Sequence, residues 1–325
     1  MRIGVIGVGR IGSMHAELLS QRVPGASVSA IFDAFPAAAR TVAANLGLEA
    51  TSSVEELLAA PDVDAVAICT STDTHADLIV AAAKAGKAIF CEKPISLELA
   101  EVDRALAAVD AADVPFQIGF NRRFDPGHAT VAAADVGEPH LIRISSRDPA
   151  PPPLAYVEVS GGIFLDMTIH DFDMARFLAR SEVVEVFARG AVRIDPGFAD
   201  AGDVDTAVIV LEHENGCLTT IDNSRQAVYG YDQRVEVFGS EGMAASENPL
   251  ANAAIVRTAE GTHAATLPYF FLDRYIPSYL REWEAFVDAV TNGTPPVVGP
   301  ADARAPLVIG LAAWESLREG RPARL

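Results

Sequence analysis

Short apolar runs recur along the first third of the chain, separated by segments long enough to form helices. Because these runs do not alternate between apolar and polar residues, they are typical of parallel strands that are buried on both faces. We predict strands at residues 2–6, 27–32, 65–69, 88–91 and 115–119. We predict helices at residues 11–20, 36–46, 54–59, 77–85 and 97–113. This order indicates an α/β fold with a doubly wound parallel sheet.

The pattern changes after residue 119. Most later runs alternate with a period of two and are separated by Gly or Asn-Gly turns, which favours antiparallel strands. Strands are predicted at residues 140–147, 183–194, 204–211, 217–224, 234–239 and 253–258, helices at 127–134, 278–290 and 301–317, and a proline-rich loop at 147–153. We therefore predict two domains, residues 1–120 and residues 121–325, the second being α+β with a large, mostly antiparallel sheet. One helix layer covers only one face of a sheet, so the other face is expected to mediate oligomerisation.

The composition narrows the class of protein. Hydrophobic residues make up 50% of the chain and charged residues 21%, as in globular proteins. The net charge of −19 argues against nucleic acid or an anionic membrane as a partner. The cysteines at 69, 91 and 217 have neither zinc-site nor CxxC spacing, which favours a reducing cytoplasm. No apolar run is long enough to span a bilayer, and no secretory signal precedes the first strand.

A glycine-rich turn follows the first strand. Gly7 permits a tight turn, Gly9 lets the backbone approach a pyrophosphate, and Gly12 allows the next helix to pack on the strand. Arg10 and Ile11 open that helix, whose amide groups would face the phosphates. The strand, turn and helix together predict a Rossmann dinucleotide site.

Asp33 ends the second predicted strand, where an acidic residue accepts hydrogen bonds from the adenosine ribose hydroxyls. Its charge would repel a 2′-phosphate, so we predict NAD in preference to NADP. The alternative is that Asp33 caps the helix that follows.

Polar residues also end the third and fourth strands, where a doubly wound sheet opens its ligand crevice. Thr70 and Ser71 follow the third strand and are predicted to contact the cofactor, with His75 as a secondary candidate that could instead begin the next helix. Glu92 and Lys93 follow the fourth strand and are assigned to the cofactor site as well.

Lys93 is also a candidate catalytic residue. Its ammonium group can donate a charged hydrogen bond to a substrate oxygen beside the nicotinamide. The alternative is a surface lysine paired with Glu92. Pro94 fixes the backbone at this point, and the sequence does not decide whether its peptide bond is cis.

Residues 161–178 begin with two glycines and continue as an apolar-periodic run, which predicts a loop and then one helix. On a single helix Asp166 and His170 share one face, with Asp173 near the same stripe. A carboxylate can orient an imidazole one turn away, so the pair suits proton transfer. The alternative is a solvated acidic face with an ordinary histidine. No second His or Cys has metal-ligand spacing, and we predict no metal site.

These motifs in this order resemble the glucose–fructose oxidoreductase / inositol dehydrogenase / rhizopine catabolism (Gfo/Idh/MocA) family over essentially the whole chain. Four segments are most similar in sequence to the bacterial inositol dehydrogenases of this family. They are GFNRRF (119–124), SRDPAPP (146–152), LDMTIHDFDMARFL (165–178) and FLDRY (271–275). The resemblance implies NAD-dependent oxidation of a ring secondary alcohol of a cyclitol, myo-inositol above all.

The resemblance also implies roles for individual residues. Lys93, Asp166 and His170 would be catalytic, with the histidine as base. The polyol pocket would be lined by Arg122, Arg123, Asp148, Tyr231 and the stretch before Tyr275. A homotetramer or homodimer is implied. Three alternatives stay open: a same-family dehydrogenase for another polyol or sugar, a non-catalytic NAD-sensing regulator, and an enzyme that uses tightly bound cofactor for hydrolysis or epimerisation.

Overall fold

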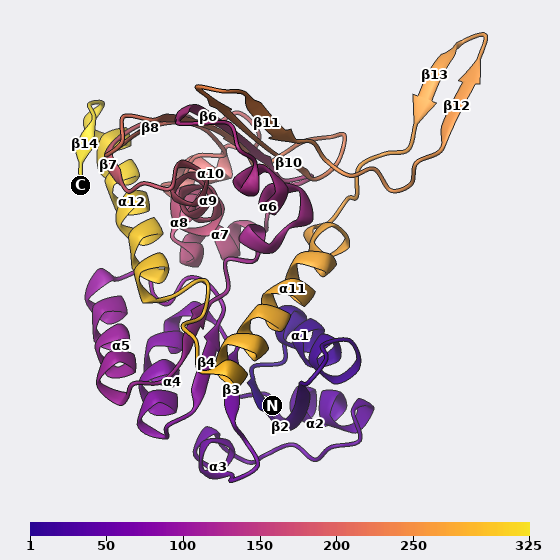
Figure 1. The fold of residues 1–325 in the computed structure, drawn as a ribbon, viewed down its shortest axis with the longest axis vertical. Coiled ribbons are helices and arrows are strands. Elements are labelled where there is room, and N and C mark those ends of the chain that lie inside the picture. The colour runs from indigo at the N-terminus through magenta and orange to yellow at the C-terminus, as the bar shows by residue number, and fades with distance from the viewer. The chain divides into compact units, whose positions relative to one another are not determined.

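The computed structural model describes residues 1–325, which divide into two compact units (Figure 1). The first unit comprises Met1–Asn121 and Tyr279–Ala305, and the second comprises Arg122–Ser278 and Pro306–Leu325. The chain passes from one unit to the other near residue 121 and again within the two long C-terminal helices, α11 (Phe271–Asn292) and α12 (Pro300–Glu319).

The first unit contains a five-stranded parallel sheet with the order β2-β1-β3-β4-β5, which confirms the predicted doubly wound architecture. Its strands are β1 (Arg2–Ile6), β2 (Ser27–Phe32), β3 (Ala65–Ile68), β4 (Ala88–Cys91) and β5 (Phe116–Ile118). The strand order reverses between β1 and β3, so the ligand crevice is expected at the carboxyl ends of these two strands.

Five helices connect or flank these strands: α1 (Arg10–Gln21), α2 (Pro36–Asn45), α3 (Val54–Ala59), α4 (Thr72–Lys84) and α5 (Leu99–Ala112). Helix α4 begins at Thr72, five residues before the predicted start. The sequence expectation was wrong here because polar residues such as Thr74 stabilise the first turn, its Oγ1 donating to the Ser71 carbonyl at 2.8 Å. No helix of the protein combines the length and the apolar character needed to cross a bilayer.

The core of the first unit includes part of α11. Trp283, Phe286 and Val287 are buried in the cluster that also holds Phe90 of β4, and the rings of Trp283 and Phe90 lie 4.2 Å apart. These contacts explain why Tyr279–Ala305, which the sequence alone assigned to the second domain, belongs to the first unit. Aromatic side chains of this size contribute much of the apolar area that a core buries.

The second unit contains a seven-stranded sheet with the order β11-β10-β6-β9-β8-β7-β14. The β6–β9 pair is parallel and the other pairs are antiparallel, which confirms a mostly antiparallel sheet. Its strands are β6 (Pro139–Arg147), β7 (Val183–Ala191), β8 (Thr206–His213), β9 (Leu218–Ser224), β10 (Asp232–Gly239), β11 (Met243–Ser246) and β14 (Ala323–Arg324).

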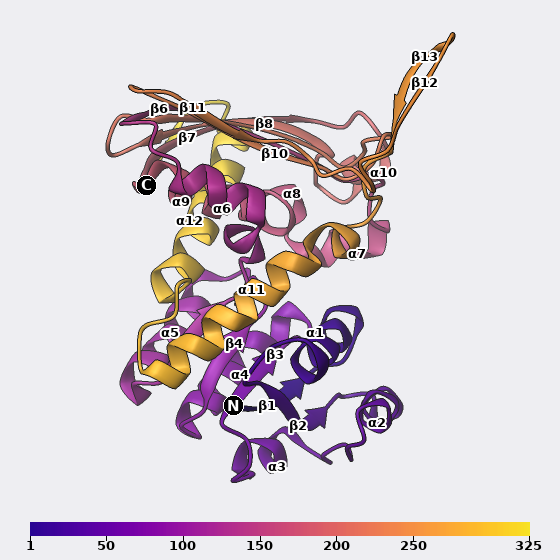
Figure 2. The ribbon, with the colours of Figure 1, turned by 45° about the vertical axis from the view of Figure 1, so that its right-hand side comes forward.

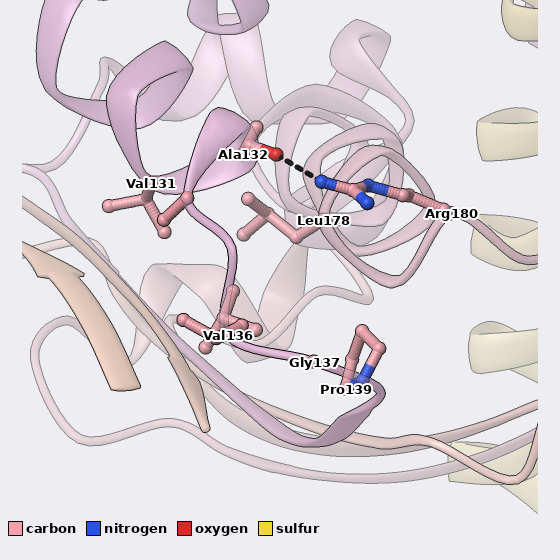
Figure 3. A pocket seen from close by; sticks show the side chains of 9 residues that line it. Val131, Ala132, Val136, Gly137, Pro139, Leu178 and Arg180 are labelled. Carbon is pink, nitrogen blue, oxygen red and sulfur yellow. Dashed lines mark hydrogen bonds between the residues drawn. The ribbon is translucent and has the colours of Figure 1, made fainter. Parts of the chain in front are cut away.

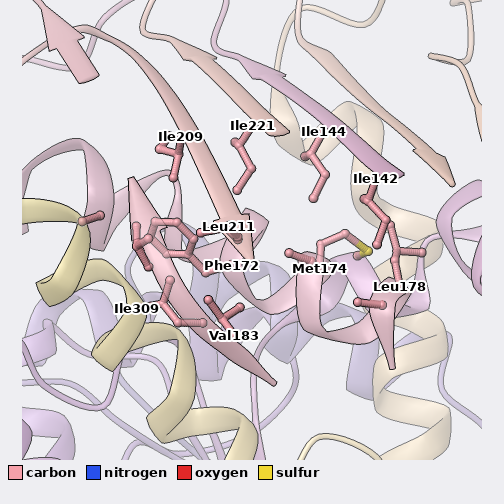
Figure 4. Close-up of a cluster of buried hydrophobic side chains, with 14 of the residues drawn as sticks. Ile142, Ile144, Phe172, Met174, Leu178, Val183, Ile209, Leu211, Ile221 and Ile309 are labelled. Carbon is pink, nitrogen blue, oxygen red and sulfur yellow. The ribbon is translucent and has the colours of Figure 1, made fainter. Parts of the chain in front are cut away.

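Helices of the second unit cover one face of this sheet (Figure 2). Ile142 and Ile221 from the strands pack against Phe172 and Met174 of α9 and Ile309 of α12 in one buried cluster (Figure 4). Besides α11 and α12, this unit contains α6 (Pro126–Ala133), α7 (Leu154–Ser160), α8 (Gly162–Asp166), α9 (Ile169–Ala179) and α10 (Gly197–Asp200), and the 3-10 turn η1 (Asn121–Phe124) leads into it.

The predicted single helix within residues 161–178 is wrong. Asp166 is the last residue of α8, and α9 begins at Ile169 with Thr168 at its N-cap. The Thr168 hydroxyl donates to Asn223 Oδ1 at 2.5 Å, and its amide bonds the Ile163 carbonyl, five residues back. A tertiary hydrogen bond from a threonine thus stabilises the break, so Asp166 and His170 do not share one helical face.

The predicted strand at 253–258 does not join the large sheet. Residues Ile255–Thr258 (β12) pair only with Gly261–Ala264 (β13), forming an isolated two-stranded hairpin whose eight strand residues are all exposed. The hairpin extends from the second unit in both views (Figures 1 and 2).

Candidate active site

The glycine turn has the geometry of a phosphate-binding loop. Gly7 has a φ of +87°, and a Cβ on Gly12 would lie 1.9 Å from the Gly7 carbonyl oxygen, so neither position accepts a side chain. A Cβ on Gly9 would have no atom within 4 Å, so this face of the turn is open to a ligand. Helix α1 begins at Arg10 without a side-chain cap, so the amides of Arg10 and Ile11 suit an anion at this helix N-terminus. These residues fit a dinucleotide pyrophosphate.

Asp33 ties the glycine turn to the end of β2. Its Oδ2 accepts from the Val8 amide at 2.7 Å, and its Oδ1 accepts from the Phe35 amide at 2.8 Å. Phe35 holds the N-cap position of α2, so the carboxylate lies next to the cap without being the cap itself. Each oxygen retains a lone pair that can accept from a ribose hydroxyl.

His75 lies between the ends of two strands. Its Nδ1 is 2.8 Å from the Pro94 carbonyl and its Nε2 is 3.0 Å from the Thr70 carbonyl, and only 1% of the residue is exposed. Burial lowers the pKa of His75, and a neutral imidazole donates through only one nitrogen. The contacts are those of a clamp that holds Thr70 and the Glu92–Pro94 turn in place. Ser71 holds the N-cap position of α4 beside this clamp.

The Glu92–Pro94 turn follows β4 directly, and the peptide bond between Lys93 and Pro94 is cis. Oε1 of Glu92 lies 2.7 Å from Nε2 of His15, a buried residue of α1. The structure therefore places Glu92 and Lys93 at the carboxyl edge of the parallel sheet, as predicted from the sequence.

In the second unit, Asp166 lies at the centre of a polar cluster. The Tyr156 hydroxyl donates to its Oδ1 at 2.9 Å, and Nη1 of Arg225 donates to its Oδ2 at 2.8 Å. The same Nη1 is 3.6 Å from Oδ2 of Asp148, so one guanidinium bridges two predicted site carboxylates. His170, the second residue of α9, follows this cluster in the chain.

Burial sets the protonation of this cluster. It raises the pKa of Asp148 to about 6, with a further upward contribution from the charge of Asp166, while Arg225 opposes the shift. Burial and the neighbouring Asp166 also raise the pKa of Tyr156, so its hydroxyl remains a hydrogen-bond donor at neutral pH. The site thus holds a donor phenol and a carboxyl group that titrates close to neutrality.

Arg122 belongs to a second buried network. Its Nη1 donates to Asp171 at 2.6 Å and to Ser146 at 2.9 Å, and its guanidinium lies 6.0 Å from the ring of Tyr275. The ring of Tyr231 meets that of Tyr275 edge-on at 5.9 Å. The structure therefore brings the predicted pocket residues Arg122 and Tyr231 together around Tyr275.

Arg123 has a different environment. Its guanidinium makes two hydrogen bonds to Asp173, at 2.9 and 2.6 Å, and lies 5.1 Å from the ring of Phe177. The Nε and Nη2 atoms of Arg123 each donate to one oxygen of Asp173, and this bidentate pair joins η1 to α9.

Several buried polar atoms in the second unit have no protein hydrogen-bond partner. Among them are the hydroxyl of Tyr275 and the Nε and Nη2 atoms of Arg225. Buried polar groups in native proteins are nearly always satisfied, so these atoms point to water or a polar ligand. A polyhydroxylated molecule can supply both donors and acceptors to such a set.

Sequence reasoning missed Tyr156, Arg225 and His15. Tyr156 and Arg225 lie 10 and 59 positions from Asp166, and His15 lies 77 positions from Glu92. No local spacing connects such partners. The His15 and Glu92 pair could have been suspected only from an ionisable residue on the buried face of α1.

The structure shows no metal-binding cluster. No group of three or more His, Cys, Asp or Glu side chains is arranged to hold a metal ion. Figure 3 shows a small pocket beside Arg180, whose Nη2 donates to the Ala132 carbonyl at 2.7 Å. Most of the residues that line the pocket are apolar, including Val131, Val136 and Leu178, and none is a predicted site residue.

Comparison with known families agrees with this geometry. Residues 1–120 match the oxidoreductase family with an NAD-binding Rossmann fold (GFO_IDH_MocA), and residues 128–245 match the GFO/IDH/MocA C-terminal domain. The chain is 50% identical to myo-inositol 2-dehydrogenase of Thermotoga maritima, over 100% of this chain and 98% of the relative. It is 46% identical to inositol 2-dehydrogenase of Rhizobium meliloti (99% and 98%) and 38% identical to NAD⁺-dependent scyllo-inositol 2-dehydrogenase of Bacillus subtilis (100% and 96%).

Solved structures with the same fold cover the whole chain. A probable dehydrogenase from Thermotoga maritima superposes with a TM-score of 0.98 at 50% identity, covering 100% of this chain and 98% of that one. The scyllo-inositol dehydrogenase of Lactobacillus casei, determined with NAD(H) and scyllo-inositol, superposes with a TM-score of 0.92 at 28% identity, covering 100% and 98%.

Proposed function

The chain belongs to the GFO/IDH/MocA oxidoreductase family, and we propose that it oxidises a ring secondary alcohol of an inositol with NAD as the hydride acceptor. The preferred substrate is myo-inositol and the product 2-keto-myo-inositol. The observation that carries the proposal is the buried cluster in which Arg225 bridges Asp148 and Asp166, accompanied by unsatisfied donors that a polyol would satisfy.

The cofactor is assigned to the first unit. The amides at the start of α1 would hold the pyrophosphate, and Asp33 would accept from the adenosine ribose hydroxyls. Thr70 and Ser71 would line the crevice beside β3. When bound, NAD accepts a hydride from the substrate carbon. Because Asp33 carries a negative charge where NADP has a phosphate, the protein would prefer NAD.

We assign the proton chemistry to three side chains. His170 accepts the proton of the reacting hydroxyl at Nε2 and passes it to solvent. Asp166, held by Tyr156 and Arg225, orients the imidazole and the neighbouring hydroxyl. Lys93 donates a charged hydrogen bond to the substrate oxygen and stabilises the negative charge that develops there. The carbon loses hydrogen as hydride and becomes a ketone.

The pocket residues are assigned to binding the remaining hydroxyls. Asp148, Arg122 and Tyr231 offer a carboxylate, a guanidinium and a phenol, which suit the vicinal hydroxyls of a cyclitol. Arg123 is placed at the edge of this set because Asp173 already engages its guanidinium.

A second candidate substrate is scyllo-inositol, favoured by the 38% identity to the Bacillus subtilis enzyme named for it. The deciding experiment is NADH formation at 340 nm with myo-inositol, scyllo-inositol, D-chiro-inositol and D-glucose, each with NAD and with NADP. The proposal requires the highest kcat/KM for myo-inositol with NAD. Higher kcat/KM for scyllo-inositol would establish the second candidate, and no turnover of any inositol would refute both.

We also propose that the protein assembles as a homodimer or homotetramer through the outer face of the large sheet. Met243, Phe238, Leu141 and Leu218 lie in register across four strands and are each exposed. A contiguous apolar row of this kind is typical of an interface. Sedimentation of the Phe238→Glu variant as a smaller species than the unmodified protein would support this assignment, and an unchanged mass would refute it.

The roles of the two domains and the cellular compartment complete the proposal. Residues 1–120 would bind the cofactor, and residues 121–325 would bind substrate and form the oligomer. The three buried free cysteines suit a reducing compartment, so we place the protein in the cytoplasm, where its state can be checked by fractionation.

A further inference from the structure

His15 is enclosed by aromatic side chains in the first unit. It is 0% exposed, and the rings of Phe90, Tyr279 and Trp283 meet it edge-on at 5.4, 5.4 and 5.5 Å. Neither the predicted chemistry nor the proposed reaction uses this residue. A fully buried imidazole needs partners for both ring nitrogens, and the structure supplies them.

The two partners of His15 fix its tautomer. The indole Nε1–H of Trp283 donates to Nδ1 at 2.8 Å, so Nδ1 carries no proton. Nε2 therefore carries the ring proton and donates to Oε1 of Glu92 at 2.7 Å. Because an indole nitrogen can only donate, the imidazole is held neutral and the charge of the Glu92 carboxylate is not cancelled by an imidazolium.

Gly119 leaves room for the second oxygen of this carboxylate. A Cβ on Gly119 would lie 3.1 Å from Oε2 of Glu92, so the absence of a side chain there leaves room for this rotamer. The negative charge of Glu92 affects two neighbouring thiols. Burial is the main cause of the raised pKa of Cys69 and of Cys91, and the charge of Glu92 raises both further. Only 15% of the Glu92 side chain is exposed.

The sheet order places Glu92 at one end of the cofactor site. Carboxyl ends of parallel strands lie along one edge, and the order β2-β1-β3-β4 sets Asp33, the glycine turn, Thr70 and Glu92 in a row along it. With the adenosine ribose assigned to Asp33 and the pyrophosphate to the glycine turn, the nicotinamide end extends toward Glu92.

We propose that Trp283 and His15 are positioning residues that hold the Glu92 carboxylate, as a fixed negative charge, at the nicotinamide end of the site. This charge favours the cationic oxidised ring over the neutral reduced ring, so it strengthens NAD⁺ binding relative to NADH binding. The inference rests on the proposed NAD site and does not depend on which polyol is oxidised. For a partly exposed charge near the ring, the discrimination is roughly tenfold in relative affinity.

The test measures dissociation constants of NAD⁺ and NADH by calorimetry in the absence of substrate. Glu92→Gln keeps the shape and an acceptor for His15 but removes the charge. We expect the NADH-to-NAD⁺ ratio of dissociation constants to fall by roughly tenfold, mostly through weaker NAD⁺ binding. The control is Asp33→Asn at the adenosine end, which should change both constants by a similar factor. An unchanged ratio in Glu92→Gln overturns the proposal.

The role of Trp283 in positioning the Glu92 carboxylate is tested with Trp283→Phe, which keeps an aromatic ring but removes the indole donor. The ratio should move part of the way toward that of Glu92→Gln. If Glu92→Gln changes the ratio and a folded Trp283→Phe does not, the positioning role is wrong. If Trp283→Phe does not fold, Gly119→Ala crowds the carboxylate instead, with a Cβ 3.1 Å from Oε2, and should also move the ratio toward that of Glu92→Gln.

Failure of the proposed reaction is distinguishable from failure of this inference. A protein that binds both cofactor forms with the expected ratios but turns over no inositol keeps the Glu92 assignment and loses the substrate assignment. If the protein turns over myo-inositol but Glu92→Gln leaves the ratio of the NADH and NAD⁺ dissociation constants unchanged, the substrate assignment is kept and the Glu92 assignment is lost.

Discussion

Arg225 donates from Nη1 to Oδ2 of Asp166 at 2.8 Å, with only 3% of the arginine side chain exposed. The same atom lies 3.6 Å from Asp148, and the two carboxylates come from opposite ends of a segment that contains α7 and α8. A single buried cation therefore compensates two carboxyl groups that would otherwise repel each other.

Removing this cation should destabilise the protein. Arg225→Met leaves Asp166 without its ion-pair partner, and loss of one member of a buried pair typically costs about 3–5 kcal/mol. We expect such a decrease in the free energy of unfolding in urea, together with a large loss of kcat. Arg143→Met, which removes an exposed pair with Glu236, is the matched control and should cost less than about 1 kcal/mol. Equal effects of the two variants would contradict the special role of Arg225.

Substitution of His170 tests the proposed base. His170→Ala should lower kcat on the true substrate by roughly a hundredfold or more, because a positioned general base contributes about that much. NAD binding should change little, since the histidine belongs to the second unit. His263→Ala, in the exposed β13 strand, is the control. Turnover near that of the unmodified enzyme in His170→Ala would remove this residue from the mechanism.

Lys93 is tested in the same assay. Lys93→Ala removes the proposed charged donor to the substrate oxygen, and we expect a loss of kcat comparable to that of His170→Ala. Lys84→Ala, in the last turn of α4, controls for loss of a lysine and should leave kcat unchanged. If the Lys93 variant retains kcat and only KM rises, the lysine binds substrate without stabilising the transition state.

Asp33 should set the choice between NAD and NADP. Asp33→Asn removes the charge that would repel a 2′-phosphate and keeps an acceptor for only one of the Val8 and Phe35 amides, which bond different oxygens of the carboxylate. The ratio of kcat/KM values for NAD over NADP should fall by roughly tenfold, equivalent to about 1.4 kcal/mol of repulsion. An unchanged ratio would disprove the ribose assignment.

Asp148 should make stability depend on pH. Its folded-state pKa is raised to about 6, so folding favours the protonated form. The stabilisation by protonation is fully present below the unfolded pKa near 4 and is lost as the pH rises through about 6. The advantage of Asp148→Asn over the unmodified protein in free energy of unfolding should therefore grow by about 2–3 kcal/mol between pH 4 and pH 7, measured in urea without cofactor. A pH-independent difference would contradict the shifted pKa.

Much of the first unit follows from short-range signals. The glycine turn, Asp33 and the Glu92–Pro94 turn each lie directly after an apolar strand, and parallel strands end at one edge of a sheet. The sequence therefore predicted the architecture and the position of the candidate cofactor residues along that edge, including Thr70 after β3.

The segment containing Asp166 and His170 shows where such signals fail. Helical periodicity predicts one face for both residues, but the Thr168 hydroxyl bonds Asn223 and stabilises a break between α8 and α9. The spacing of apolar residues along a segment indicates only the helix that the segment could form by itself. A hydrogen bond to a residue 55 positions away depends on the folded chain.

The sequence by itself determined the class of fold, the order of the strands in the chain, the dinucleotide motif and the residue types available for chemistry, because each depends on neighbours a few positions apart. Tertiary structure decided the side-chain partners, namely Arg225 and Tyr156 for Asp166, His15 for Glu92, and Trp283 for His15. It also decided the packing of α11 in the first unit. Packing and desolvation act between segments that are remote in the chain, so no local pattern encodes these choices.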